Sequence, residues 1–444
     1  MRKLTTFLLL MMLVGWAFAQ NPKVINLDAD VHELKVTSKN PLEMTVHKRM
    51  ADIRIKTIST KQGEFEVLGA QGLMQIFDVG NPNLPVVSRL IEMPLGATPV
   101  VEVVGAKSQT LALADYNINN QVMPCQPSVS KSADKEALPF HFNEKAYASN
   151  QFLGGGLATI EESGILRHTR LGRLEIRPVK YNPVTGELKV FYDIELKIRF
   201  KDANLKATQD RKAQYASSFF SGIFKDVLNY RAPAREYIDD DPITYVIVSD
   251  RMFETQIEQL IEWKKMKGFN VEVAYTDVIG STTSEIKSYI QDLYENPVVT
   301  PPSFVLLVGD VEQVPAWDGD TDSHVTDLDY VEFTGDNLPE IYYGRFSAQN
   351  VEQLQPQIDK TLEYEKYQMA DPSYLNNALL VAGNDESWED IYGNGAMWYA
   401  DNYYFNEEHG INSHLFLQDP PNGNSAVSDS IIENINNGVS FANY

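Results

Sequence analysis

The sequence contains very little cysteine, which excludes covalent cross-links as a source of stability. Cys125 is the one cysteine among 444 residues, so no disulfide can form within the chain. A chain of this length suggests two or three domains, each able to bury a core of its own. With 43% hydrophobic residues, the folded protein must be stabilised by the packing of those cores.

A long apolar run is also missing. A membrane-spanning helix takes about 20 consecutive apolar residues, and the best candidate, residues 7–14, is too short to be an anchor. This run follows two basic residues and precedes a small-x-small site at residues 17–19, which is the pattern of a cleavable secretory signal peptide. We therefore predict that residues 1–19 are removed after Ala19 and that the protein is secreted or held at the cell surface. Such a leader on a chain with almost no cysteine favours a bacterial protein.

Positive charge is scarce as well. The chain has 38 lysine and arginine residues against 61 aspartate and glutamate residues, which gives a net charge of −23. Because this charge repels phosphate backbones and anionic membrane surfaces, we exclude nucleic acid and such membranes as partners. The negative charge is compatible with binding of divalent cations, and equally with plain solubility.

Residues 21 to 230 have the two-residue period of β-strands. Residues 51–57 and 65–68 alternate between apolar and polar side chains, and residues 186–200 do so most clearly. The apolar face of this last stretch is formed by Leu188, Val190, Tyr192, Leu196, Ile198 and Phe200. Because no helical pattern longer than two turns is found before about residue 217, the region is predicted to be an all-β sandwich.

From residue 243 onward, apolar strands alternate with helical patterns. We predict strands at residues 244–249, 270–274, 304–308, 377–382, 414–416 and 439–443. We predict helices at residues 255–267, 284–294, 351–367, 395–404 and 425–437. Because Ser284 and Glu285 open the second helix and Gly268 ends the first, both have recognisable boundaries. Strand–helix alternation of this kind produces parallel strands with helices on both faces of a sheet.

A polar, proline-containing segment at residues 229–241 separates the two regions. It carries Arg231, Arg235 and three consecutive aspartates. Exposed segments of this composition are favoured sites of proteolytic cleavage. An ordinary interdomain linker is the alternative.

An acidic loop follows the predicted strand at residues 304–308. Its charged residues are Asp318, Asp320, Asp322, Asp327, Asp329, Glu332, Asp336 and Glu340, together with His324. Open α/β sheets bind their ligands at the carboxyl ends of the strands, and Ca²⁺ prefers several oxygen ligands at once. The spacing is not that of an EF-hand, so a solvated acidic loop remains the alternative.

The sequence has no recognisable catalytic motif of its own. It contains no nucleophile elbow, zinc-protease helix, P-loop or dinucleotide-binding glycine motif. Cys125 lies between two nearby prolines in the β region, where a loop or core thiol is expected. Residues 154–156 are three glycines without a strand–helix context, which indicates a turn. The residues themselves therefore predict no complete active site.

Several stretches of the second region carry a resemblance to a known family. They are TYVIVSD (residues 244–250), WKKMKGFNVEV (263–273), SFVLLVGDVEQVPA (303–316), PEIYYGRFSA (339–348), QIDKTLEYEK (357–366) and NNGVSFANY (436–444). In this order and spacing they resemble the gingipain-type cysteine endopeptidases, peptidase family C25. Residues 170–200 are similar to the propeptide of that family. The resemblance extends over nearly all of the chain after the leader.

The resemblance implies a caspase-like α/β fold with a His/Cys catalytic dyad, preceded by an all-β sandwich propeptide. It places both members of the dyad beyond residue 444, so the second α/β subdomain is expected to be incomplete and residues 1–444 alone inactive. It also implies that Asp385 orients the catalytic base, although a loop or N-cap carboxylate is the alternative. The expected division is signal peptide 1–19, propeptide 20–230, linker 231–241, and α/β subdomains 242–375 and 376–444.

The same resemblance gives meaning to the linker and the acidic loop. It implies cleavage after Arg231 or Arg235, which separates the peptidase from a prodomain that inhibits it within the same chain. It also implies structural calcium, for which the candidate ligands are Asp327, Asp329, Asp336 and Glu340. The predicted function is an exported cysteine endopeptidase zymogen acting on proteins or peptides. The alternatives are a non-catalytic C25-like surface or secretion component, and a β-sandwich adhesin joined to a calcium-binding α/β module.

Overall fold

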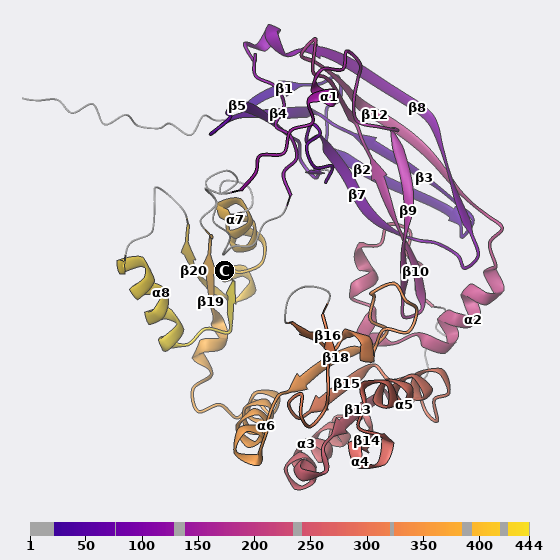
Figure 1. The fold of residues 1–444 in the computed structure, drawn as a ribbon, viewed down its shortest axis with the longest axis vertical. Helices are drawn as coiled ribbons and strands as arrows, with labels where there is room; N and C mark the ends of the chain where they lie inside the picture. Colours follow the sequence, from indigo (N-terminus) through magenta and orange to yellow (C-terminus); the bar gives the residue numbers. More distant parts are fainter. Residues whose placement is uncertain are drawn as a thin grey trace, which may run out of the picture. The chain divides into compact units, whose positions relative to one another are not determined.

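The computed structural model (Figure 1) describes residues 22–75, 77–127, 138–233, 242–319, 324–383, 393–417 and 425–443. Contacts within the chain divide it into two compact units. The first unit comprises Met1–Asp240 together with Glu332–Glu340. The second comprises Asp241–Val331 and Ile341–Tyr444. The predicted signal peptide lies outside the described residues.

The first unit is built from antiparallel sheets. One sheet has the order β1-β4-β5, a second β6-β7-β10-β9, and a third β11-β12-β3-β2 with β8 on the other side of β12. The strands are β1 Lys23–Asn26, β2 Glu33–Asn40, β3 Glu43–Arg49, β4 Asp52–Thr60, β5 Gly63–Gly69, β6 Met74–Gln75, β7 Pro85–Glu92, β8 Thr98–Ala112, β9 Ala158–Leu166, β10 Thr169–Ile176, β11 Val179–Asn182 and β12 Glu187–Lys201. Two short helices complete it, α1 Glu144–Tyr147 and α2 Leu205–Tyr215.

The inner faces of the second and third sheets pack together into one core. Its buried residues come from β3, β12, β7 and β10, and include Val46, Ile91, Leu174, Ile194 and Leu196. Along β12 the buried positions alternate as predicted at Leu188, Val190, Leu196, Ile198 and Phe200, because successive side chains of a strand point to opposite faces. The predicted core residue Tyr192 is only half-buried, at the point where the register shifts between Phe191 and Asp193, whereas Ile194 is buried as well. The predicted all-β sandwich is therefore confirmed.

The helix α2 corrects the prediction that no helix longer than two turns occurs before residue 217. Leu205–Tyr215 is an 11-residue helix without an apolar stripe. Its stabilisation comes from polar contacts instead: the Asn204 side chain caps its N-terminus, and the Thr208 hydroxyl accepts the N–H of Leu95 at 2.9 Å. Periodicity cannot detect a helix of this kind, because apolar periodicity is absent.

The second unit contains two parallel sheets flanked by helices. The larger has the order β14-β13-β15-β18 and the smaller β20-β19-β21. Their strands are β13 Thr244–Ser249, β14 Asn270–Tyr275, β15 Phe304–Val308, β18 Tyr342–Phe346, β19 Asn377–Val381, β20 Asn412–Phe416 and β21 Phe441–Asn443, with a short antiparallel pair of β16 Trp317–Asp318 and β17 Val325–Thr326. The helices are α3 Glu254–Met266, α4 Thr276–Ile279, α5 Thr283–Glu295, α6 Val351–Glu365, α7 Asn394–Tyr403 and α8 Ser425–Asn437. The predicted α/β class is thus confirmed.

Short 3₁₀ turns connect many of these elements. They are η1 Leu113–Tyr116, η2 Ser218–Phe220, η3 Ile223–Asp226, η5 Arg251–Phe253, η6 Leu328–Tyr330, η7 Pro372–Asn376 and η9 Glu407–His409.

The predicted start of α5 at Ser284 is too late. The side chain of Thr282 caps this helix and forms a capping box with Glu285, which satisfies two backbone N–H groups at once.

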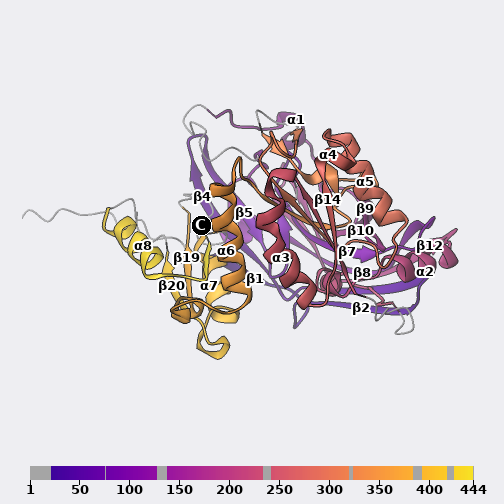
Figure 2. The same ribbon diagram turned by 90° about the horizontal axis from the view of Figure 1, so that it is seen from below.

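The helices α3 and α6 lie side by side on one face of the larger sheet (Figure 2). They bury Ile257, Leu260 and Leu354 against Ile247 and other apolar residues of β13 and β15. The crossover from β13 runs through α3 to β14 on one side, whereas β15 connects to β18 on the other. The loops after β13 and β15 therefore leave the sheet in opposite directions. Open α/β sheets bind their ligands at the carboxyl ends of two such neighbouring strands.

Candidate functional site

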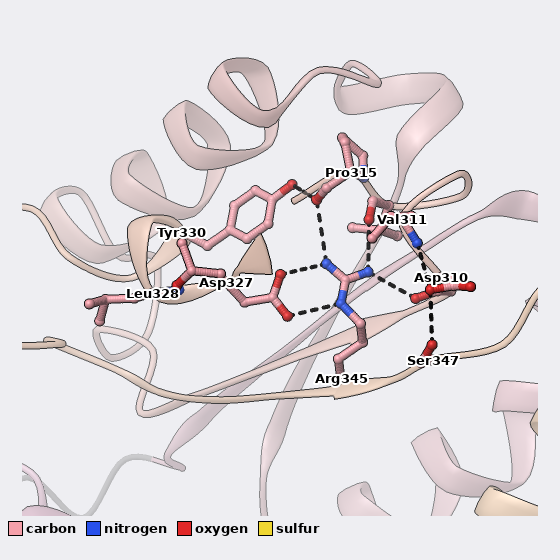
Figure 3. A network of polar contacts seen from close by, with 11 residues as sticks. Asp310, Val311, Pro315, Asp327, Leu328, Tyr330, Arg345 and Ser347 are labelled. Carbon is pink, nitrogen blue, oxygen red and sulfur yellow. Dashed lines mark hydrogen bonds and ion pairs between the residues drawn. The ribbon is translucent and has the colours of Figure 1, made fainter. Parts of the chain in front are cut away.

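An arginine clamp dominates the carboxyl edge of the larger sheet (Figure 3). Arg345 on β18 forms a two-pronged ion pair with Asp327, with Nε to Oδ2 at 2.9 Å and Nη2 to Oδ1 at 2.6 Å. Its Nη1 donates to the carbonyls of Gly309 at 2.9 Å and Val314 at 2.7 Å, and Nη2 to that of Pro315 at 3.4 Å. These contacts occupy all five N–H donors of a guanidinium. Arg345 therefore fixes the loops and has no donor left for a substrate.

Asp310 organises the neighbouring turn at the end of β15. Its carboxylate accepts hydrogen bonds from the Gln349 amide and the Val311 N–H, both at 2.9 Å, and from the Ser347 hydroxyl at 3.0 Å. These bonds, that of Gln349 first, hold the pKa of Asp310 below its usual value. The carboxylate is therefore ionised at neutral pH and ties the ends of β15 and β18 together.

Tyr330, the last residue of η6, closes the same edge. Its hydroxyl donates to the carbonyl of Pro315 at 2.6 Å, and burial raises its pKa. The ring contacts Trp317 edge-to-face, with the two centroids 4.5 Å apart. Tyr330 thus joins η6 to the turn that follows β15.

The predicted calcium ligands are divided between the two units. Both carboxylate oxygens of Asp327 accept hydrogen bonds from Arg345. Asp327 and Asp329 belong to the second unit, whereas Asp336 and Glu340 belong to the first. Within the described ranges, no group of three or more carboxylate, histidine or cysteine side chains could hold a metal ion. Structural calcium therefore stays a prediction.

Glu340 differs from a calcium ligand in its environment. Its side chain is fully buried, and burial raises its pKa to about 7. Its carboxyl group accepts a hydrogen bond from the Phe333 N–H at 2.9 Å, and its other oxygen lies 3.2 Å from the Thr334 hydroxyl oxygen. With a pKa of about 7, this carboxyl is only partly ionised at neutral pH.

Of the predicted processing residues, Arg231 is described, whereas Ala19 and Arg235 lie outside the described residues. The Arg231 N–H donates to the Glu92 carboxylate at 2.9 Å, and its carbonyl accepts from Lys212 Nζ at 2.5 Å. Lys212 and Glu92 also form a buried ion pair at 2.5 Å. The backbone of Arg231 is therefore held on both sides by one ion pair.

Sequence reasoning missed both the Arg345 clamp and the Lys212–Glu92 pair. The motif YYGRF contains Arg345, but it does not indicate which residue pairs with it. Lys212 was missed because it lies on α2, a helix without an apolar stripe. The predicted base-orienting residue Asp385 lies outside the described residues. Cys125 is buried, its Sγ donates to the carbonyl of Gln126 at 3.7 Å, and burial raises its thiol pKa. An inert buried thiol matches the sequence interpretation.

Fold and site together define an α/β protein with parallel sheets, preceded in the chain by an antiparallel β-sandwich. Two family models divide the chain in the same order. The propeptide model Propeptide_C25 matches residues 20–227, and the model of peptidase family C25 matches residues 238–444. The chain belongs to peptidase family C25 and carries the propeptide of that family.

Relatives come from the bacterium Porphyromonas gingivalis. Lys-gingipain W83 is 35% identical over 451 residues, which cover 100% of this chain and 26% of the relative. Gingipain R2 is 27% identical over 449 residues, which cover 98% of this chain and 57% of the relative. The chain thus spans about a quarter of the length of Lys-gingipain W83.

Solved structures of such relatives resemble parts of the chain. A structure described as showing the zymogenic latency of gingipain K is 35% identical, covers 41% of this chain and 100% of its own, and has a TM-score of 0.39. A complex of the RgpB pro- and mature domains is 24% identical, covers 45% of this chain and 98% of its own, and has a TM-score of 0.37. In the part of the chain that the structure describes, no helix has both the length and the apolarity that a membrane crossing requires.

Proposed function

We propose that this chain is the leading part of an exported cysteine endopeptidase zymogen of the gingipain type. The observation that carries the proposal is the succession of a propeptide and a C25 peptidase region in one chain. The identity of 35% with Lys-gingipain W83 extends over both regions. Residues 20–230 would act as an inhibitory prodomain within the same molecule, and residues 1–19 as the export signal.

The chemistry proposed is that of a thiolate peptidase. A histidine lowers the effective pKa of a cysteine thiol, the thiolate attacks the peptide carbonyl, and backbone N–H groups stabilise the oxyanion. In this chain the parallel strands β19 and β21 would position the loops that carry such groups. Cys125 is no candidate for the nucleophile, because its thiol is buried and its pKa is raised.

The comparisons favour lysine as the residue before the cleaved bond. Lys-gingipain W83, whose name refers to lysine, is 35% identical to this chain, against 27% for gingipain R2. A lysine-specific enzyme would not cut its own linker after Arg231 or Arg235. We therefore infer that a second, arginine-directed protease performs that cleavage.

The experiment uses the complete gene product, produced with its leader in a bacterial host. Hydrolysis of paired lysine and arginine peptide substrates is measured before and after cleavage of the linker, with and without iodoacetamide. The proposal expects thiol-dependent hydrolysis of the lysine substrate, appearing after cleavage, from protein found outside the cytoplasm. A folded, cleaved and exported product without hydrolysis would instead favour the non-catalytic surface component. Residues 20–444 alone are expected to be inactive in the same assay.

A further inference from the structure

A short segment of the peptidase region belongs structurally to the propeptide. Residues Glu332–Glu340 fall between η6 and β18 in the sequence, and both of those elements are part of the second unit. By its contacts, however, this segment clusters with the first unit. Because the segment is covalently continuous with the second unit at both ends, whatever holds it also holds the peptidase region. We call it the docking segment.

The centre of the docking segment fits a notch in the β9–β10 hairpin. Asp336 Oδ2 accepts a hydrogen bond from the Ile165 N–H at 2.6 Å. Gly164, next to it, has a φ of +134°, and a Cβ at this position would lie 2.6 Å from the Asp336 carboxyl. Only glycine both adopts this conformation without strain and leaves room for the carboxylate.

The end of the docking segment is held by a buried arginine. Arg167 is 1% exposed, and its Nη1 donates to the carbonyl of Glu340 at 3.1 Å. Its Nε donates to the carbonyl of Tyr215 at 2.6 Å, and its guanidinium lies 4.8 Å from the ring centroid of Phe220. Burial of an arginine is costly unless its donors are paired. The Glu340 carbonyl is thus part of what makes this burial tolerable.

Internal hydrogen bonds hold the docking segment in shape. The Glu332 carboxylate accepts the N–H of Thr334 at 2.9 Å and that of Asp336 at 3.1 Å. The Thr334 hydroxyl donates to Asp336 Oδ2 at 2.8 Å, which orients the carboxylate that meets Ile165. A loop braced in this way loses little conformational freedom on docking, which favours affinity.

We propose that the docking segment is the recognition element by which the propeptide retains the peptidase region after the linker between them is cut. Asp336 in the Gly164–Ile165 notch is the specific anchor, and Arg167 is the second contact. The proposal rests on the proposed function in one respect, namely that the chain is cut at the linker. It requires no peptidase activity.

The test follows the two fragments after a controlled cut. In the complete gene product, a site-specific protease sequence replaces residues 234–241, the protein is cut there, and fragment dissociation is measured by size-exclusion chromatography and native mass spectrometry. The unsubstituted fragments are expected to stay together. Asp336→Ala leaves a half-buried N–H without its charged acceptor and should accelerate dissociation about ten- to hundredfold.

Two further variants separate docking from folding. Gly164→Ala should also accelerate dissociation. Gly186→Ala is the matched control, because Gly186 has a positive φ as well, of +65°. It should not affect dissociation, since a Cβ at residue 186 meets nothing within 4 Å. In the double variant Gly164→Ala/Asp336→Ala, the two effects should be less than additive, since both act on one contact. Dissociation rates that are the same for the unsubstituted protein and for Asp336→Ala would overturn the proposal. If the fragments stay together in an Asp336-dependent way but the product has no hydrolytic activity, the docking proposal is supported and only the proposed peptidase function is contradicted.

Discussion

The two units bury different kinds of side chain. In the second unit, β13 and β15 bury nearly continuous apolar runs, and among its described residues Lys264, paired with Glu365 at 2.6 Å, is the one buried charged side chain. The first unit buries many more side chains that can carry a charge, namely Lys48, Glu66, Glu92, Arg167, His168, Lys180, Lys212, Glu332 and Glu340. Buried charges are costly unless they are paired and hydrogen-bonded. The first unit is therefore expected to depend on individual polar contacts and on pH, and the second on apolar packing.

The two units can be followed separately by tryptophan fluorescence. The five tryptophans are Trp16, Trp263, Trp317, Trp388 and Trp398. Apart from Trp16, which is in the predicted leader, they all belong to the second unit. Intrinsic tryptophan fluorescence therefore reports unfolding of the second unit, and hydrogen exchange of amides in β3, β7, β10 and β12 reports unfolding of the first.

The largest effect is expected from Lys212→Met. The substitution leaves the Glu92 carboxylate buried without its cation, which should destabilise the first unit by about 3–5 kcal/mol. Urea unfolding followed by hydrogen exchange measures this loss. The matched control on the same helix is Lys206→Met, since Lys206 pairs with Asp210 at the surface and should contribute almost nothing. Equal losses in both variants would contradict the assignment of Lys212.

The same substitution should expose the bond after Arg231. In the folded first unit the Arg231 carbonyl is bonded to Lys212, so a protease cannot draw it into an oxyanion hole without breaking that bond. Limited trypsin digestion followed by N-terminal sequencing should detect fragments beginning at Ala232 much earlier in Lys212→Met than in the unsubstituted protein. Rapid cutting at this bond in the unsubstituted protein would show that the clamp is open in solution.

The next effect is expected from Leu260→Ala in the second unit. Leu260 is 1% exposed in the core between α3, α6 and the sheet. Its truncation should cost about 2–5 kcal/mol through lost transfer energy and a residual cavity. Tryptophan fluorescence should register the loss, whereas hydrogen exchange of the first unit should change little. Met266→Ala, which alters a residue on the same helix that is 78% exposed, serves as the control.

The contrast between apolar packing and polar pairing also explains which structural features the sequence predicts. The strand at residues 304–308 and the helix at 425–437 have the predicted bounds, because uninterrupted apolar runs and apolar stripes determine them. The helix α2 was missed, since its stability comes from tertiary polar contacts. Likewise, nothing in the local sequence around Asp327 pairs it with Arg345, which is 18 residues away. Apolar periodicity is local, whereas polar pairing depends on the completed fold.

The pH dependence of the first unit should follow from His168. Burial, with the charges of Lys212, Arg167 and Arg211, lowers the pKa of His168 from 6.5 to about 3. The unfolded chain therefore takes up a proton below pH 6.5 that the folded first unit does not bind, so stability falls as pH falls from about 6.5 towards 3. The slope from this residue approaches about 1.4 kcal/mol per pH unit.

His168→Gln isolates that contribution. The variant should be less stable at neutral pH, since His168 Nε2 bonds to the Tyr230 hydroxyl at 2.9 Å and the ring packs against Phe224. Its stability should nevertheless fall less steeply between pH 6.5 and pH 3 than that of the unsubstituted protein. Parallel pH curves for the two proteins, measured by hydrogen exchange of the first unit, would contradict both the sign of the effect and its assignment to His168.

The smallest effect is expected from calcium. An ion at Asp327 must compete with the guanidinium of Arg345, and two of the other three candidate ligands, Asp336 and Glu340, are hydrogen-bonded within the first unit. Millimolar Ca²⁺ should therefore stabilise the protein by less than about 1 kcal/mol, which corresponds to an ion concentration below about four times the dissociation constant. Thermal unfolding followed by tryptophan fluorescence, in Ca²⁺, in Mg²⁺ and in chelator, measures the shift. A Ca²⁺-specific stabilisation of several kcal/mol, lost in Asp327→Asn, would show that the loop rearranges to bind the ion and that apolar packing alone does not account for the stability of the second unit.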